Sequence, residues 1–195
     1  MKKLSLLTLV ICISLQGCMQ HESIAHEHRP QDWGSLVSQT HNFYQISNDV
    51  YRSEQPDTAM ISELKDHQIG TIINLRAKDA DSLVFKNENF NLVHIPINTW
   101  AIDRQDLLEV MQQIKIAKQN DQRVLLHCYH GSDRTGASVA MYRIIFENWT
   151  IDDAVKEMFD IPKSWKLDAQ MVFGNKTADP DPKEKEDINK RVIIK

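Results

Sequence analysis

The sequence contains little cysteine, with only Cys12, Cys18 and Cys128 among its 195 residues. Two of these lie close to the N-terminus, so the rest of the chain holds one thiol and cannot be built on a disulfide framework. Basic residues are also in the minority, because 23 Lys and Arg stand against 27 Asp and Glu, for a net charge of -4. This balance argues against a nucleic-acid partner. There is no internal repeat, and a hydrophobic content of 42% is typical of a globular protein with one core.

The N-terminus lacks an apolar run of the length that a permanent membrane span needs. Lys2 and Lys3 precede a short apolar stretch over residues 4–15, which is the pattern of a secretory signal peptide. The residues Leu-Gln-Gly-Cys at 15–18 resemble the lipobox of bacterial lipoproteins, in which cleavage precedes the cysteine and the cysteine receives the lipid. Residues 1–17 are therefore predicted to be a lipoprotein signal peptide, with lipidation at Cys18.

The same resemblance implies a periplasmic protein that is lipid-anchored to the membrane. Met19 follows the cysteine where some lipoproteins have Asp, which favours the outer membrane. An ordinary signal peptide with an accidental cysteine, or a cytosolic protein with an apolar first helix, are the alternatives. If Cys12 is removed with the leader and Cys18 is acylated, Cys128 is the one free thiol, and a lone thiol in an exported protein indicates catalysis.

Domain boundaries follow the changes in composition. Residues 18–40 are polar and irregular and are predicted to tether the lipid to the domain. Three histidines in this stretch match no usual ligand spacing, so no metal is expected. Residues 41–175 are predicted to form the catalytic domain, and residues 176–195 a charged C-terminal tail with little structure of its own.

Strands and helices alternate along the predicted domain. A turn signal at Asn48 and Asp49 separates two β-favouring runs, at 43–47 and 50–53, and predicts a hairpin. Further strands are expected at 71–75, 92–97 and 124–126, and helices from Pro56 to a cap at Gly70, around 81–89, over 107–117, over 137–149 and after Thr150. This order predicts an α/β fold with a central, largely parallel sheet flanked by helices.

The segment from His127 to Thr135 carries the most specific chemical pattern. A buried strand leads into Cys128, a loop connects Cys128 to Arg134, and a helix follows. A strand-loop-helix arrangement directs backbone N–H groups and the positive end of the helix at one point, which favours a dianion. Gly131 permits the backbone conformation that such a nest needs, and the guanidinium of Arg134 can hold two phosphate oxygens at once.

Cys128 is the predicted nucleophile of this loop. The positive electrostatic field that would bind phosphate also favours the thiolate form of Cys128. The thiolate could attack phosphorus and form a cysteinyl-phosphate intermediate, which water later cleaves. The hydroxyl of Thr135 could hydrogen-bond the sulfur and ease its departure in the second step. His127 is expected to orient the loop through its ring nitrogens rather than to transfer protons.

Residues 127–135 match each fixed position of the motif His-Cys-x5-Arg-Ser/Thr and so resemble the cysteine-dependent protein tyrosine and dual-specificity phosphatase superfamily. The runs VYRSEQP at 50–56 and TIINLR at 71–76 are similar to the opening of small bacterial and fungal-type atypical dual-specificity phosphatases. The resemblance covers residues 41–160. It implies a protein tyrosine phosphatase-like fold and a phosphomonoester hydrolase that is monomeric and needs no cofactor or metal.

Two other functions fit part of this pattern. A rhodanese-type sulfur carrier also keeps a cysteine loop after a strand, but Thr135 directly after an arginine favours phosphate chemistry. A catalytically silent phosphate-binding module would keep the loop without turnover, and the intact Cys128 and Arg134 argue against it. The glycine-rich stretch that the family has after Met158 is absent from this sequence.

The loop composition bears on the substrate. The residues assigned to phosphate binding are Tyr129, His130, Gly131, Ser132, Asp133 and Arg134. The variable positions contain no Lys or further Arg, and Asp133 is acidic where a polyphosphorylated inositol would need positive charge. A phosphoprotein, with phosphotyrosine first, is therefore preferred over an inositol phosphate or phosphoinositide. Arg76, Lys78, Lys163 and Lys166 either line the pocket or are ordinary surface charges.

The general acid is expected on a loop that precedes the nucleophile by some tens of residues, as the resemblance implies. Residues 98–103 form such a loop directly after a predicted strand, and Asp103 is the candidate. Asp103 could instead only cap the helix that begins near Arg104, in which case Asp106 would supply the proton.

Overall fold

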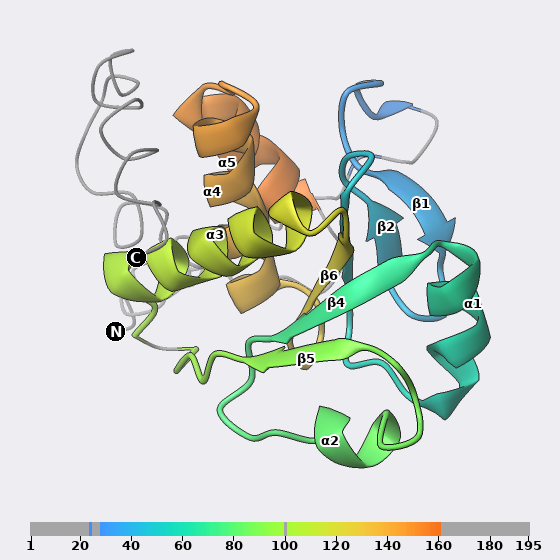
Figure 1. The fold of residues 1–195 in the computed structure, drawn as a ribbon. Helices are drawn as coiled ribbons and strands as arrows, with labels where there is room; N and C mark the ends of the chain where they lie inside the picture. Colours follow the sequence, from blue (N-terminus) through green and yellow to red (C-terminus); the bar gives the residue numbers. More distant parts are fainter. Residues whose placement is uncertain (1–23, 25–27, 100, 161–195) are drawn as a thin grey trace, which may run out of the picture.

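The computed structural model describes residue 24, residues 28–99 and residues 101–160. In this part of the chain six strands form one sheet in the order β1-β2-β3-β6-β4-β5 (Figure 1). The strands are β1 (Ser35–Ser38), β2 (Phe43–Gln45), β3 (Val50–Ser53), β4 (Ile69–Asn74), β5 (Asn91–His94) and β6 (Arg123–His127). β3, β6, β4 and β5 are parallel, whereas β1 and β2 extend the sheet as antiparallel strands. The predicted largely parallel sheet is confirmed.

Helices cover both faces of the sheet (Figure 1). They are the short 3-10 helix η2 (Thr58–Met60), α1 (Ile61–Asp66), α2 (Asp81–Val84), α3 (Arg104–Gln119), α4 (Asp133–Phe146) and α5 (Ile151–Asp160). α3, α4 and α5 pack on one face, and α1 and α2 pack on the other. The chain therefore has the predicted α/β fold with a central sheet flanked by helices.

The central strands contribute alternate side chains to two separate cores. Ile73 and Leu126 belong to the larger core beneath α3, α4 and α5, whereas Ile72 and Leu125 belong to the smaller core beneath α1 and α2. All four side chains are fully buried. Because both faces of β4 and β6 are covered, successive residues must be apolar, and this explains the continuous apolar runs that predicted these strands.

The helices next to the sheet differ in how they are buried. α3 buries a single apolar stripe, as its periodicity predicted. This stripe consists of Leu107, Val110, Met111, Ile114 and Ala117. α4 is buried on most of its surface, because it lies between the sheet and α5. The N-terminus of α4 is therefore held firmly at the end of β6, where the loop of interest ends.

The predicted cap at Gly70 is wrong. α1 ends at Asp66, and Gln68 takes the left-handed conformation, with φ of 56°. β4 begins at Ile69, which pairs with Arg123 of β6, so Gly70 already belongs to the strand. Tertiary pairing therefore outweighed the preference of glycine for the end of a helix.

Part of the segment predicted as a tether, residues 18–40, is structured. Residues 35–38 form the edge strand β1, which pairs with β2. Before it, Arg29 Nε pairs with Asp160 Oδ2 at 2.8 Å, and the Gly34 N–H donates to Glu157 Oε1 at 2.7 Å. An edge strand and contacts between charged groups need few apolar residues, so their composition resembles that of a linker.

Several predicted segments lie outside the described residues. They are the signal peptide at 1–17 with the lipidation site Cys18, the last part of the catalytic domain at 161–175, and the tail at 176–195. Within the described ranges, none of the helices has both the length and the apolar character that crossing a bilayer requires.

Candidate active site

The candidate site lies at the carboxyl ends of the parallel strands. His127, the last residue of β6, pairs with Ser53 of β3 on one side and with Asn74 of β4 on the other. The segments that leave β3 and β4 therefore flank the loop that begins at Cys128. The side chain of Cys128 is only 1% exposed, so the loop and its neighbours enclose it. Ligand sites of parallel α/β sheets occur at this edge.

Three successive carbonyl groups of the loop face away from its centre. Each accepts a hydrogen bond from a residue outside the loop. The donors are the Gln55 N–H for Tyr129 at 3.2 Å, the Asn42 side-chain amide for His130 at 3.0 Å, and the Arg52 guanidinium for Gly131. A trans peptide points its N–H opposite to its C=O, and none of the described peptides is cis. The N–H groups of residues 130–132 therefore point inward, as in an anion-binding nest.

Gly131 is the residue on which this loop turns. Its φ is 72°, in the region that favours glycine. A Cβ at this position would lie 2.5 Å from the Ser53 carbonyl oxygen and 2.8 Å from the Glu54 nitrogen. The prediction that Gly131 permits the conformation of the nest agrees with this geometry, and the close packing on Ser53 adds a second reason for glycine.

Arg134 and Thr135 lie in the first turn of α4 with polar atoms that point into the protein. Arg134 Nη1 donates long hydrogen bonds to the carbonyl oxygens of Leu75 at 3.4 Å and Ile97 at 3.3 Å. Arg134 Nε and Thr135 Oγ1 are buried and have no hydrogen-bond partner within the described residues. Both atoms can therefore serve a phosphate or the cysteine sulfur without first breaking a bond to the protein.

The remaining loop residues divide between the surface and the interior. Tyr129 is 55% exposed, and its ring makes an edge contact with the His130 ring at 4.6 Å between centroids. Ser132 and Asp133 are buried at the start of α4. The loop thus presents its aromatic residues outward and its helix-starting residues inward.

Arg52 is a buried cation beneath the loop whose role the sequence did not indicate. Its side chain is fully buried, in the strand β3 whose four residues are all buried. Burial lowers the pKa of Arg52 to about 10, although the charges of Glu157 and Cys128 act to raise it. At that pKa the guanidinium stays protonated at neutral pH. A fixed positive charge therefore lies near Cys128.

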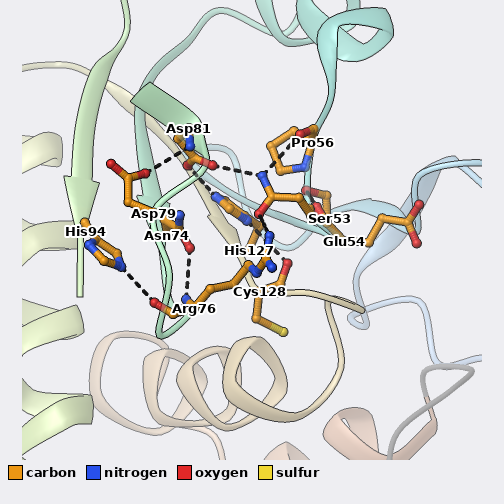
Figure 2. A network of polar contacts seen from close by, with 11 residues as sticks. Ser53, Glu54, Pro56, Asn74, Arg76, Asp79, Asp81, His94, His127 and Cys128 are labelled. Atoms are coloured by element: carbon orange, nitrogen blue, oxygen red, sulfur yellow. Dashed lines mark hydrogen bonds and ion pairs between the residues drawn. The ribbon is translucent and has the colours of Figure 1, made fainter. Parts of the chain in front are cut away.

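His127 is held by a carboxylate that the sequence analysis did not include in the site. Figure 2 shows Asp81 and His127 facing each other beside Cys128, and His127 Nε2–H donates to Asp81 Oδ2 at 2.7 Å. Both side chains are buried. The predicted orienting role of His127 fits this arrangement. Asp81 was missed because it lies 46 residues before His127, in a segment without a recognisable motif.

Arg76 lies at the rim of the loop. Its guanidinium carbon is 5.0 Å from the centroid of the Tyr129 ring, which is a cation–π contact. Lys78, the other candidate from this segment, is exposed. Lys163 and Lys166 lie outside the described residues. Of the four basic residues considered for the pocket, Arg76 is the one that contacts the loop within the described part.

Asp103 and Asp106, the two candidate general acids, meet at the start of α3. The Asp103 carboxylate accepts from the N–H groups of Gln105 at 2.8 Å and Asp106 at 2.9 Å. The Asp106 carboxylate accepts from the Asp103 N–H at 3.1 Å, which completes a capping box. Asp103 therefore does cap the helix and is exposed there. To deliver a proton, its carboxyl group must turn out of the cap.

Comparison with family models matches residues 50–172 to the dual specificity phosphatase catalytic domain. This chain belongs to the dual-specificity phosphatase family. Over 153 residues it is 31% identical to the dual specificity protein phosphatase TpbA of Pseudomonas aeruginosa strain UCBPP-PA14. That alignment covers 78% of this chain and 69% of TpbA. The sequence prediction of the superfamily, and of a protein-tyrosine or dual-specificity phosphatase, is thereby confirmed.

Solved structures of the dual-specificity phosphatases give the same result. The crystal structure of P. aeruginosa TpbA superposes with a TM-score of 0.63 at 31% identity, covering 67% of this chain and 80% of that chain. A Cys-to-Ser variant of TpbA in complex with phosphotyrosine has a TM-score of 0.63 at 30% identity and covers 67% and 79%. The core catalytic domain of the PP-IP phosphatase SIW14 from S. cerevisiae, at 20% identity and a TM-score of 0.61, supports the fold alone and covers 82% and 98%.

Gly131→Ala tests the packing of the loop from Cys128 to Arg134 in this phosphatase. The added Cβ would meet the Ser53 backbone at a positive φ, so the loop must shift. We expect turnover of an aryl phosphate to fall by about 10²-fold, and stability to fall by more than about 1 kcal/mol in urea denaturation. Gly70→Ala is the control, because Gly70 lies at the start of β4, the end opposite the loop, and an added Cβ there would meet the Gln122 side chain, at 3.0 Å. Equal kinetics for the two variants would contradict the packing argument.

Proposed function

We propose that this dual-specificity phosphatase hydrolyses phosphotyrosine in phosphoproteins through a cysteinyl-phosphate intermediate on Cys128. The observation that carries the proposal is the set of outward-facing carbonyl groups in the loop, which turns the adjacent N–H groups inward. These N–H groups, the buried charge of Arg52 and the guanidinium of Arg134 act on the position that follows β6. Such a site stabilises both a bound phosphate dianion and a thiolate.

In the first step the Cys128 thiolate attacks phosphorus. A sulfur–phosphorus bond forms, and the bond from phosphorus to the tyrosine oxygen breaks. The leaving phenolate takes a proton from Asp103, which we assign as the general acid. The loop N–H groups and Arg134 hold the non-bridging oxygens while charge moves between the attacking and leaving atoms.

In the second step water attacks the phosphorus of the intermediate and the sulfur leaves as a thiolate. The water gives its proton to the Asp103 carboxylate, and inorganic phosphate is released. Thr135 assists by donating its hydroxyl to the departing sulfur. The buried Oγ1 of Thr135, which has no partner among the residues that the structure describes, supports this role.

The preference for phosphotyrosine rests on three observations. A variant of TpbA was solved in complex with phosphotyrosine. The variable positions of the loop carry no Lys or further Arg, which a polyphosphorylated inositol would need. Tyr129, with 55% of its surface exposed, offers an aromatic face beside the loop on which a substrate ring can pack. Inositol phosphates and phosphoinositides are the alternative class of substrate.

We further infer that the protein works in the cell envelope, anchored by a lipid on Cys18 and released from its leader at residue 17. Lys2 and Lys3, the short apolar stretch and the residues Leu-Gln-Gly-Cys at 15–18 support this location. A periplasmic enzyme at the outer membrane is the form that Met19 favours. Phosphoproteins at or near that membrane would be its substrates.

A substrate panel tests the proposed specificity. We expect the highest kcat/KM for a phosphotyrosine peptide, because its long rigid phenol reaches an enclosed thiol more easily than the short side chains of phosphoserine or phosphothreonine. The panel contains the three phosphopeptides, inositol phosphates and soluble phosphoinositide headgroups at matched concentrations, with phosphate release as the readout. A strong preference for inositol polyphosphates would overturn the assignment of a phosphoprotein substrate.

Cys128→Ser should abolish turnover and retain binding of phosphate or vanadate, because the loop N–H groups and Arg134 remain. Arg134→Lys should also be severe, since a point charge cannot reproduce two parallel contacts to phosphate oxygens. Steady-state kinetics and isothermal titration with vanadate measure the two properties separately. Hydrolysis by Cys128→Ser would eliminate the covalent mechanism, and near-normal kinetics for Arg134→Lys would remove Arg134 from its role.

Asp103→Asn should lower turnover of phosphotyrosine by about 10² to 10⁴-fold, because the amide can still accept the N–H groups of the cap but has no proton to give. An aryl phosphate with an activated leaving group should lose less, since that group departs with little protonation. Asp106→Asn is the matched control within the same capping box. If Asp106→Asn shows the leaving-group dependence and Asp103→Asn does not, the two roles must be exchanged.

Cys18→Ser should move the protein from the membrane fraction to the soluble periplasmic fraction, because the residue that carries the lipid is lost. Phosphatase activity should be unchanged. Cys12→Ser is the matched control, because it changes a cysteine inside the leader and should leave the membrane association intact. A wild-type protein that already fractionates as soluble would refute the anchor.

A further inference from the structure

The buried Asp81 and the half-buried Gln55 form a hydrogen-bonded pair behind the nucleophile. The Asp81 carboxylate is almost fully buried and accepts two hydrogen bonds from side chains. Oδ2 accepts from His127 Nε2–H at 2.7 Å, and Oδ1 accepts from Gln55 Nε2 at 2.8 Å. His127 directly precedes Cys128, so one oxygen of Asp81 holds the residue before the nucleophile.

Gln55 extends the same contact to the residue after the nucleophile. Its backbone N–H donates to the carbonyl oxygen of Tyr129 at 3.2 Å. Its side-chain oxygen accepts from Arg76 Nη1 at 2.8 Å, and the Arg76 guanidinium lies over the Tyr129 ring. Tyr129 is thus held through its backbone and through its ring. Both neighbours of Cys128 are connected to Asp81.

The far ends of this arrangement are fixed as well. Asp81 is the first residue of α2, and its N–H donates to Asp79 Oδ1 at 2.9 Å. The Arg76 N–H donates to Asn74 Oδ1 at 2.9 Å, and His94 Nε2–H donates to the Arg76 carbonyl oxygen at 2.8 Å (Figure 2). Neither Asp81 nor Arg76 can therefore move without breaking further hydrogen bonds. Asp81 and Gln55 thus hold the loop in one position relative to the sheet.

We propose that Asp81 and Gln55 are positioning residues of the phosphatase reaction, which hold His127 and Tyr129 and thereby set the place of the Cys128 sulfur. The proposal rests on the proposed role of Cys128 as nucleophile. The sulfur must meet phosphorus in line with the leaving oxygen, and a displacement of about 1 Å can cost about 10²-fold in rate. The positioning acts on attack by sulfur and not on protonation of the leaving group.

Asp81→Asn is the sharpest test, because the side chain keeps its shape but has one acceptor oxygen in place of two. The single oxygen cannot accept from both His127 and Gln55, so one of these bonds is lost or His127 is forced into the tautomer whose Nε2 accepts from the new amide. We expect kcat to fall by about 10 to 10²-fold with little change in KM. The fall should be equal for phosphotyrosine and for an activated aryl phosphate, unlike that of Asp103→Asn. Alkylation of Cys128 by iodoacetate should also slow.

Gln55→Ala removes the side-chain bonds to Asp81 and Arg76 and leaves the backbone bond to Tyr129. This change should also lower kcat. The kcat of the double variant should be little lower than that of Asp81→Asn alone, because both changes disrupt the same group of hydrogen bonds. Asp66→Asn and Gln119→Ala are matched controls at exposed positions. Both controls should retain wild-type kcat and wild-type alkylation.

The proposal is overturned if Asp81→Asn melts like the wild type and keeps kcat within about twofold. Should Asp81→Asn fail to fold, Gln55→Ala decides by the same criterion. A fall that depends on the leaving group, or effects of the two changes that simply add, would also overturn it. Failure of the covalent mechanism would appear separately, as hydrolysis by Cys128→Ser, because alkylation reports on the thiol without any turnover.

Discussion

The loop from Cys128 to Arg134 keeps its shape because three of its carbonyl groups accept hydrogen bonds from residues outside the loop. All three donors come from residues 42–55, the hairpin region at the N-terminal side of the sheet. Part of the anion-binding capacity of the loop is therefore determined by a segment that does not contact the anion. If β3 lost its pairing with β6, the donors would move away and the loop N–H groups could no longer point to a common centre.

The strand register explains how three distant segments meet at this loop. Ser53, Asn74 and His127 form one row across β3, β4 and β6. The residues two positions further along each chain are Gln55, Arg76 and Tyr129, and these contact one another. Parallel strands keep equal steps in the same direction, so residues with the same offset beyond the sheet edge arrive side by side. The connections beyond Asn74 then bring Asp81 to His127 from outside the sheet.

The local sequence pattern was sufficient to predict most helices and strands and the loop from Cys128 to Arg134. The hairpin, the stripe of α3 and the strand that leads into Cys128 are each encoded within about a dozen neighbouring residues. Arg52, Gln55 and Asp81 could not be recognised in this way, because their roles depend on partners 21 to 79 residues away. The one local signal was an arginine in a β-favouring run directly after Val50 and Tyr51, since a buried cation requires a compensating environment. The helix cap predicted at Gly70 was wrong for the opposite reason. The strong local preference of glycine for a helix end was outweighed by the pairing of β4 with β6.

The contacts of Arg29 with Asp160 and of Gly34 with Glu157 fasten the N-terminal end of the described domain to α5. Ten residues lie between Cys18 and Arg29, so the chain takes eleven steps from one to the other. A fully extended chain spans about 3.6 Å per residue, so this connection reaches at most about 40 Å. In a protein lipidated at Cys18, Arg29 would thus stay within about one domain diameter of the bilayer surface. The catalytic domain would then be confined to a thin layer next to its membrane, and a phosphoprotein would have to enter that layer to be dephosphorylated.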